Sequence, residues 1–207
     1  MRITRAEALA CLDEARTRND GGWIAHSFAV GTAAERIAAR IDHLDAERAF
    51  VFGLLHDIGR RFGVMQMNHV IAGYRFLLEQ GDEEAAEICL THSFPVQQIT
   101  AVNSGWDLMA EDYAFLDHFL QERKYTLYDR LIQLCDAMAT DEGIVAIERR
   151  MMDIMLRYGV DETSLPRWRQ LFAMKEDFER RMGESVESVL GLRHVPPPPA
   201  VVRERRP

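Results

Sequence analysis

The sequence predicts an all-α protein, because three observations point to helices. Apolar residues recur every three or four positions through most of the 207 residues, as at Val30, Ala33 and Ile37, which is the spacing of an amphipathic helix. Capping residues, glycines and prolines fall between these stretches. No stretch sustains the alternation of apolar and polar residues that a half-buried strand shows. We therefore expect a bundle of helices.

Helix boundaries in the first half follow from capping and breaking signals. Thr4 and Glu7 form a capping box in front of the first apolar stretch, and Asp45 can cap the third. Pro95 stops the fifth, because proline cannot donate a backbone hydrogen bond. The five expected helices cover about residues 4–17, 23–40, 46–59, 66–79 and 82–93.

The second half shows one unclear stretch, four more helices and a tail. Residues 96–110 carry no periodicity, and NSGW within them looks like a turn. Helices are expected over about residues 111–122, 126–140, 144–158 and 164–188. The tail HVPPPPAVVRERRP has polyproline-II character. We predict one helical domain, residues 1–192, followed by a proline-rich basic tail, residues 193–207.

Composition excludes several classes of protein. A formal net charge of −8 argues against a binder of duplex nucleic acid, which needs a basic face for the phosphates. No stretch approaches the roughly 18 apolar residues of a membrane span, and the N-terminus lacks the apolar region of a secretory signal. The three scattered cysteines are typical of reduced thiols. We expect a cytoplasmic protein.

Six ionisable side chains are predicted to point into this bundle, from five different helices. An unpaired buried charge is costly, so the set needs a common partner. A divalent metal fits, because imidazole and carboxylate are usual ligands of Mn, Fe, Co, Ni and Zn. His56 and Asp57 are adjacent and can share one ion only at a helix end, where Gly59 loosens the backbone. The six are His26, His56, Asp57, His69, His92 and Asp136.

The remaining histidines and several aromatic residues have a structural interpretation. His43 suits a helix C-terminus, where a cation is favoured by the helix dipole. His118 lies in a polar helix, and His194 lies in the tail. The aromatic residues expected to pack the core of the C-terminal helices are Tyr158, Trp168, Phe172 and Phe178.

The order of these residues carries a family resemblance. His26, then His56-Asp57, then Asp136 resembles the H…HD…D signature of the HD-domain metal-dependent phosphohydrolase superfamily. WIAHSFAVGTAAERIA, GLLHDIGR and LIQLCDAMAT are similar to its first histidine helix, its HD helix and its last aspartate helix. The resemblance covers about residues 20–140. It implies an HD-domain-like helical bundle with additional C-terminal helices over about residues 141–190.

The same resemblance implies a ligand set and an activity. His26, His56, Asp57 and Asp136 would hold a first ion, and His69 and His92 a second, with Asp57 as the bridge. One or two divalent ions are implied (Mn, Fe, Co, Ni, Zn or Mg). The substrate class implied is a small phosphorylated compound, a nucleotide-like phosphomonoester or phosphodiester. The chain lacks the GYP motif of the cyclic-di-GMP phosphodiesterase branch, which disfavours that substrate.

Three residues are predicted to act in catalysis. Asp57 would orient the attacking water between the ions, since a bound metal activates water for phosphoester hydrolysis. Arg60 stands where many relatives have lysine, and its planar guanidinium could bind a phosphate oxygen, with Arg61 as a second candidate. His92 could protonate the leaving oxygen if His92 is not a metal ligand.

Three other interpretations stay open at this stage. An HD fold with a similar ligand set can hold a di-iron centre for oxidative cleavage. The chain could also be a non-catalytic signalling module that keeps the site for metal or ligand binding, or a plain helical bundle with polar networks. Association into a homodimer is open as well.

Overall fold

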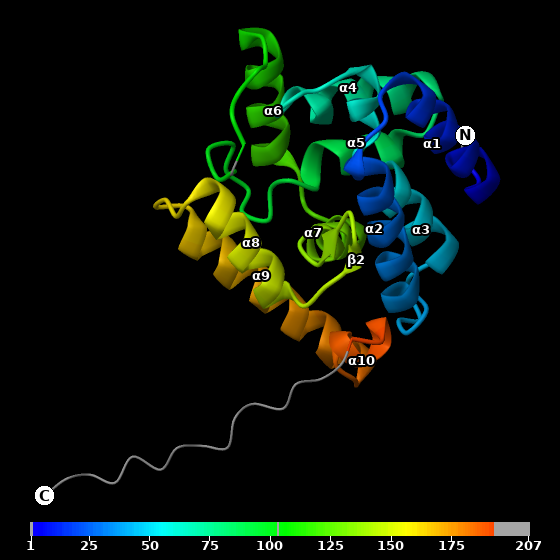
Figure 1. Ribbon diagram of the computed structural model, residues 1–207, viewed down its shortest axis with the longest axis vertical. Helices are drawn as coiled ribbons and strands as arrows, with labels where there is room; N and C mark the ends of the chain where they lie inside the picture. The colour runs from blue at the N-terminus through cyan, green and yellow to red at the C-terminus, as the bar shows by residue number, and fades with distance from the viewer. Residues whose placement is uncertain (1, 103, 193–207) are drawn as a thin grey trace, which may run out of the picture.

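The computed structural model describes residues 2–102 and 104–192, and these residues are mostly helical (Figure 1). The all-α prediction is thus confirmed. The helices and strands are α1 (Arg5–Arg18), α2 (Gly22–Ala38), α3 (Ala46–Leu55), the 3-10 helix η1 (Ile58–Phe62), α4 (Asn68–Glu79), α5 (Glu83–Thr91), α6 (Ala110–Glu122), α7 (Leu127–Asp136), β1 (Ala139–Thr140), β2 (Gly143–Ile144), α8 (Ile147–Tyr158), α9 (Ser164–Met182) and α10 (Val186–Leu190).

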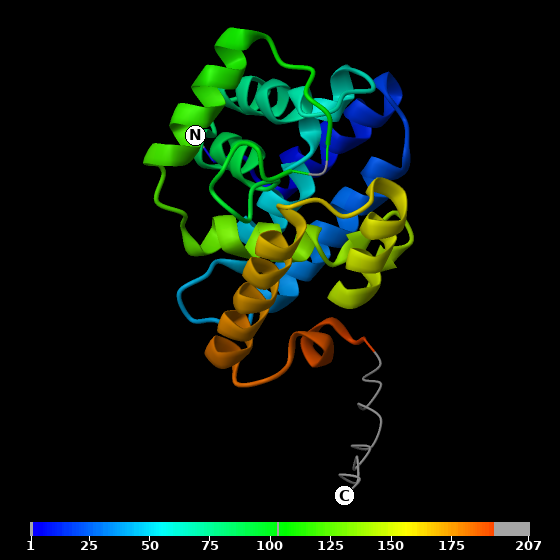
Figure 2. The ribbon, with the colours of Figure 1, turned by 90° about the vertical axis from the view of Figure 1, so that its left-hand side faces the viewer.

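Helix α7 lies in the middle of the bundle, with α2 and α3 on one side and α8 and α9 on the other (Figure 1). Seen from the side, α9 crosses α7 and packs against it (Figure 2). Helices α2 and α3 approach closely because glycines face each other: a Cβ on Gly53 would lie 2.7 Å from the Cα of Gly31. This approach places the start of α2 and the end of α3 beside the same point of the bundle.

Three of the expected helices end earlier than predicted, and the first of them, expected over 46–59, ends at Leu55. The helix expected over 126–140 ends at Asp136, and β1 and β2 then form a short antiparallel pair in which Thr140 lies opposite Gly143. The prediction of helix over residues 137–140 was therefore wrong, and the backbone turns at Gly143, whose φ is 129°. The helix expected over 164–188 is divided at Gly183 into α9 and α10. Residue 103 of the expected NSGW turn and the tail from 193 lie outside the described residues.

None of the helices in residues 2–102 and 104–192 combines the length and the apolar character that a bilayer span requires.

A buried ion pair joins α3 to the start of α5. Arg48 is 5% exposed and Asp82 is 2% exposed. The two side chains form a bidentate ion pair, in which Nη1 of Arg48 lies 2.6 Å from Oδ2 of Asp82 and Nη2 contacts Oδ1. The same carboxylate caps α5 by accepting from the backbone N–H of Ala85, and it accepts from the N–H of Ile3 at 2.8 Å. One carboxylate thus holds the N-terminus, α3 and α5 together.

Replacing Asp82 with asparagine is expected to lower the free energy of unfolding by about 3 kcal/mol at pH 7, because the buried Arg48 charge then keeps only its 3.3 Å contact with the half-exposed Glu84. Burial raises the pKa of Asp82, but Arg48 and the two backbone N–H groups lower it more, so the pKa lies below its ordinary value. The stabilisation is therefore present above the unfolded pKa of about 3.9 and is lost as the pH falls through the lower folded value. Urea unfolding at pH 7 and in acid measures both effects.

The control is Asp177→Asn in α9, which removes a carboxylate paired with two solvent-exposed arginines. Exposed pairs contribute at most about 1 kcal/mol. An Asp82→Asn variant that is as stable as this control at pH 7 contradicts the assignment.

Candidate metal centre

The structure brings all six predicted residues together at one point, and five of them stand at helix ends. His26 lies within α2. His56 and Asp57 lie between α3 and η1, His69 lies in the first turn of α4, His92 follows α5, and Asp136 is the last residue of α7. The helices converge here, so short side chains at their ends reach a common centre. The expectation that His56 and Asp57 stand at a helix end is confirmed.

The donor atoms of these residues are spaced as atoms that share an ion would be. Nε2 of His26 lies 2.9 Å from Oδ1 of Asp136. Around Asp57, Nε2 of His56 lies 3.7 Å from Oδ2, and Nε2 of His69 lies 3.1 Å from Oδ1. Atoms bound at about 2.0–2.2 Å to one metal ion lie roughly 3 to 3.5 Å apart. The donors form three overlapping groups: His26, His56 and Asp57; His56, His92 and Asp136; and Asp57, His69 and His92.

Three of the imidazoles are oriented by the backbone of their own segments. Nδ1 of each ring hydrogen-bonds to the carbonyl oxygen three residues earlier: His56 to Gly53 at 2.7 Å, His92 to Cys89 at 2.9 Å, and His69 to Gln66. A carbonyl oxygen only accepts, so Nδ1 donates, and in the neutral ring Nε2 keeps its lone pair. A carbonyl behind the ring in this way is typical of metal-binding histidines. These three Nε2 atoms all point at the centre.

Two buried atoms at this centre have no hydrogen-bond partner among the described residues: Nε2 of His56 and Oδ1 of Asp57. Their side chains are 0% and 7% exposed. Leaving a buried acceptor unpaired costs about 1–3 kcal/mol, and more for a charged group. Both atoms are electron-pair donors of the kinds that divalent metals bind. The residues present therefore fit a metal ion.

The pKa values show that the two carboxylates are strongly held in their charged form. Burial raises the pKa of Asp57, but the charges of Arg60, His56 and His69 outweigh it and hold the pKa well below its ordinary value. The pKa of Asp136 is likewise low, because its hydrogen bond to His26 and the neighbouring imidazoles outweigh burial. Burial lowers the pKa of His92 to about 3, which keeps that ring neutral. Negative oxygens and the neutral nitrogen of His92 are protonation states that ligate a cation. At His26, burial lowers the pKa, but the hydrogen bond to Asp136 outweighs it and raises the pKa above its ordinary value.

A protein-family model described as HD domain matches residues 23–141, which is more than half of the chain. The chain belongs to the HD domain family. This match confirms the resemblance seen in the sequence. The HD domain places the chain in a superfamily of metal-dependent phosphohydrolases. Searches of curated proteins and of solved structures gave no significant match.

Within the HD domain, the two arginines after the His-Asp pair have different surroundings. Nε of Arg60 donates to Oδ2 of Asp57 at 2.8 Å, and the side chain lines the cavity above the centre. Arg61 turns away: it is 6% exposed, pairs with Glu14 of α1, and lies over the ring of Phe76. Arg61 is therefore a structural residue and no candidate for phosphate binding.

Gly59 has a different function from the one expected. A Cβ on this residue would lie 1.9 Å from the carbonyl oxygen of His69 and 2.6 Å from the backbone nitrogen of Gly73. The residue is thus required for the close contact of η1 with α4, and this contact carries His69 to the centre. A side chain at position 59 would push the two segments apart.

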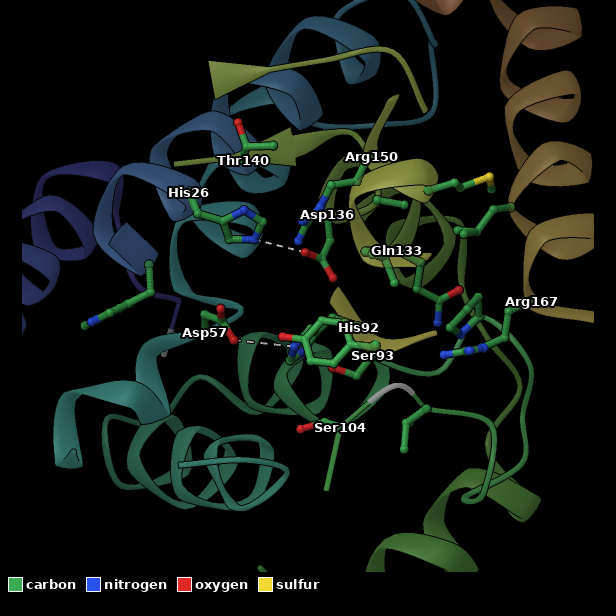
Figure 3. A pocket seen from close by; sticks show the side chains of 18 of the residues that line it. His26, Asp57, His92, Ser93, Ser104, Gln133, Asp136, Thr140, Arg150 and Arg167 are labelled. Atoms are coloured by element: carbon green, nitrogen blue, oxygen red, sulfur yellow. Dashed lines mark hydrogen bonds and ion pairs between the residues drawn. The ribbon is translucent and has the colours of Figure 1, made fainter. Parts of the chain in front are cut away.

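A cavity of about 450 Å³ lies over the centre of the HD domain, and its far wall comes from α8 and α9 (Figure 3). Phe178 packs in the core as expected, and Trp168 packs against the core and also lines the cavity. Tyr158 and Phe172 are exposed instead, and Tyr158 stands at the edge of the cavity. The sequence also gave no indication of Gln133 or of the arginines in this wall. Only their position relative to the centre distinguishes them from other polar residues of amphipathic helices. The wall arginines are Arg150, Arg157 and Arg167.

Proposed function

We propose that this HD domain protein hydrolyses phosphomonoester or phosphodiester bonds of small, nucleotide-like substrates, using one or two divalent metal ions. The observation that carries the proposal is the position of Asp57, which belongs to two of the donor groups at the floor of the cavity. Its Oδ1 is buried without a well-aligned hydrogen bond among the described residues, and Nε2 of His69 lies 3.1 Å from it, so a cation could be shared by these two atoms. A carboxylate shared by two donor groups supports a bridge between two ions.

The ligands proposed for the first ion are His26, His56, Asp57 and Asp136, and those for the second are His69 and His92 with Asp57. Nε2 of His26 and Oδ1 of Asp136 share a hydrogen bond, and both atoms would face the same ion. Binding of that ion would displace the proton between them. When bound, the metal would lower the pKa of water and polarise a phosphoryl oxygen. The candidate ions are Mn, Fe, Co, Ni, Zn and Mg.

The other residues have the following proposed roles. Arg60 fixes the orientation of the Asp57 carboxylate through Nε, and its Nη1 donates to the carbonyl oxygen of Met65 at 3.4 Å. The side chain lines the cavity, and we propose that its other N–H groups donate to a phosphate oxygen there. His92 donates through Nδ1 to Cys89, so its Nε2 carries a lone pair. This arrangement favours His92 as a ligand over the alternative in which it protonates the leaving group.

The test is metal analysis of the purified protein by mass spectrometry, followed by assays on phosphomonoesters and phosphodiesters. We expect bound divalent metal, hydrolysis of p-nitrophenyl phosphate or of nucleotides with Mn or Mg, and loss of activity after chelation. Metal binding should also raise the melting temperature, because an ion that binds only the folded chain stabilises it by mass action.

Two outcomes would overturn the proposal. A pair of iron ions with a charge-transfer absorption and no hydrolysis would indicate the oxygenase alternative. Bound metal without hydrolysis across the whole panel would indicate a signalling module. The expected cytoplasmic location and the open question of a homodimer stay predictions.

A further inference from the structure

The cavity wall opposite His56 and Asp57 carries charged side chains from residues that lie outside the stretch matched by the family model. Helix α8 begins at Ile147, beyond the matched residues 23–141. Arg150 and Arg157 of this helix both line the cavity. The two residues are seven positions apart, which is about two helical turns, so they stand on the same face of α8.

These two arginines share a single carboxylate. Nη1 of Arg150 lies 2.8 Å from Oδ2 of Asp153, and Nε of Arg157 lies 2.9 Å from Oδ1 of the same residue. In the part of the chain that the structure describes, no other carboxylate forms an ion pair with either arginine. Two guanidinium groups against one carboxylate leave one positive charge uncompensated. The wall is therefore locally positive in a protein whose formal net charge is −8.

Arg150 is the member of the group that faces the metal centre. Figure 3 shows its side chain reaching from α8 toward the Asp136 side of the centre. It lies close enough to His26 that its charge acts on that imidazole. Its Nε is buried without a hydrogen-bond partner among the described residues, and the side chain as a whole is 21% exposed. The guanidinium of this cavity-lining residue thus has an N–H group that the described residues leave without an acceptor.

The positive charge of Arg150 at this position would favour binding of an anion between Arg150 and the metal centre. Metal ions bound by the six donors would add positive charge on one side of the cavity, and Arg150 supplies it on the other. Guanidinium and phosphate form charge-assisted hydrogen bonds that are about twice as strong as neutral ones. A terminal phosphate monoester carries a charge of about −1.5 to −2 at pH 7, whereas a diester carries one negative charge. The surplus charge of the wall favours the monoester.

We propose that Arg150 binds the terminal phosphate of a small phosphomonoester in the cavity, and that Asp153 and Arg157 hold Arg150 in position. This inference rests on the proposed function and narrows its substrate class from phosphoesters in general to monoesters. Arg150 is accordingly a substrate-binding residue contributed by a helix outside the family-matched stretch.

The test compares Arg150→Gln with Arg149→Gln in protein loaded with metal. Arg149 is the neighbouring residue of the same helix, its side chain is 71% exposed, and it faces Glu142 at 3.7 Å, so it is a matched control for loss of one positive charge. Titration of inorganic phosphate by calorimetry measures the anion site without requiring turnover. We expect at least about tenfold weaker phosphate binding for Arg150→Gln and no change for Arg149→Gln, with the same metal content in both.

Kinetics and a second variant complete the design. For a phosphomonoester substrate, KM should rise about tenfold or more in Arg150→Gln, and a diester should be turned over less efficiently than the monoester by the unmodified protein. Arg150→Lys keeps the charge and should restore part of the phosphate affinity. Circular dichroism and the metal content show that each variant is folded.

The outcomes separate the two proposals. Phosphate binding that depends on Arg150 in a protein that hydrolyses nothing supports the anion site and overturns the proposed function. Equal phosphate affinity in Arg150→Gln and the unmodified protein overturns the anion site, and so does an equal loss in Arg149→Gln. Preferred hydrolysis of diesters overturns the assignment to monoesters.

Discussion

Asp57→Asn is expected to abolish tight metal binding and to lower kcat/KM for phosphoester hydrolysis by about three orders of magnitude or more, as losses of central catalytic groups do. Asp57 belongs to two of the donor groups, and its charge is set by Arg60 and the surrounding imidazoles. Asparagine keeps the shape of the side chain and removes the charge. Metal content by mass spectrometry and steady-state kinetics on p-nitrophenyl phosphate measure the two losses.

His118→Ala is the control for this prediction. His118 is exposed on α6 and belongs to none of the donor groups of the described residues, so its loss should leave metal content and kinetics unchanged. An Asp57→Asn protein that binds metal as tightly as the unmodified chain would show that Asp57 is not a metal ligand and would overturn the proposed site. Circular dichroism distinguishes a lost ligand from a lost fold.

Gly59→Ala is expected to cost the protein both stability and metal binding. The added methyl would lie 1.9 Å from the carbonyl oxygen of His69, which is far inside contact distance and against backbone. Overpacking of a core typically costs about 1–3 kcal/mol and occasionally more. Because η1 and α4 must separate to relieve the contact, His69 should move away from the centre. Thermal unfolding and metal titration measure the two effects.

Gly73→Ala tests the same helix contact from the other side. There the nearest atom to an added Cβ is Sγ of Cys89 at 3.0 Å, a side-chain atom, and the backbone nitrogen of Gly59 lies at 3.2 Å. The cost should be smaller, and metal binding should be largely kept. If the two variants lose stability and metal affinity to the same extent, the close approach to His69 is not the cause.

The metal centre was predictable because its residues follow a local pattern. His26, His92 and Asp136 share faces with apolar neighbours, and helical periodicity alone indicates that such residues point inward. The His56-Asp57 pair ends an apolar run, which indicates a helix end. The family pattern then supplied the order of the residues. Each of these signals lies within a few positions of the residue concerned.

The missed features depend on contacts between distant segments. Arg149 and Arg150 are indistinguishable in the sequence, and only the packing of α8 over the centre shows which one enters the cavity. Gly59 looks like a residue that loosens a helix end, whereas its function is a backbone contact with α4. The hairpin after Asp136 has only two residues in each strand, too few for an alternating pattern to be recognised.

The hydrogen bond between His26 and Asp136 joins residues that are 110 positions apart. A ribosome adds about 5–20 residues per second, so roughly 5 to 20 seconds separate the synthesis of the first proposed ligand from that of the last. A nascent chain that has not yet reached α7 lacks the Asp136 carboxylate and cannot complete the proposed first site. If the proposed site is correct, full metal loading would follow synthesis of the whole matched region, and bound metal would mark a chain in which both ends of that region have come together.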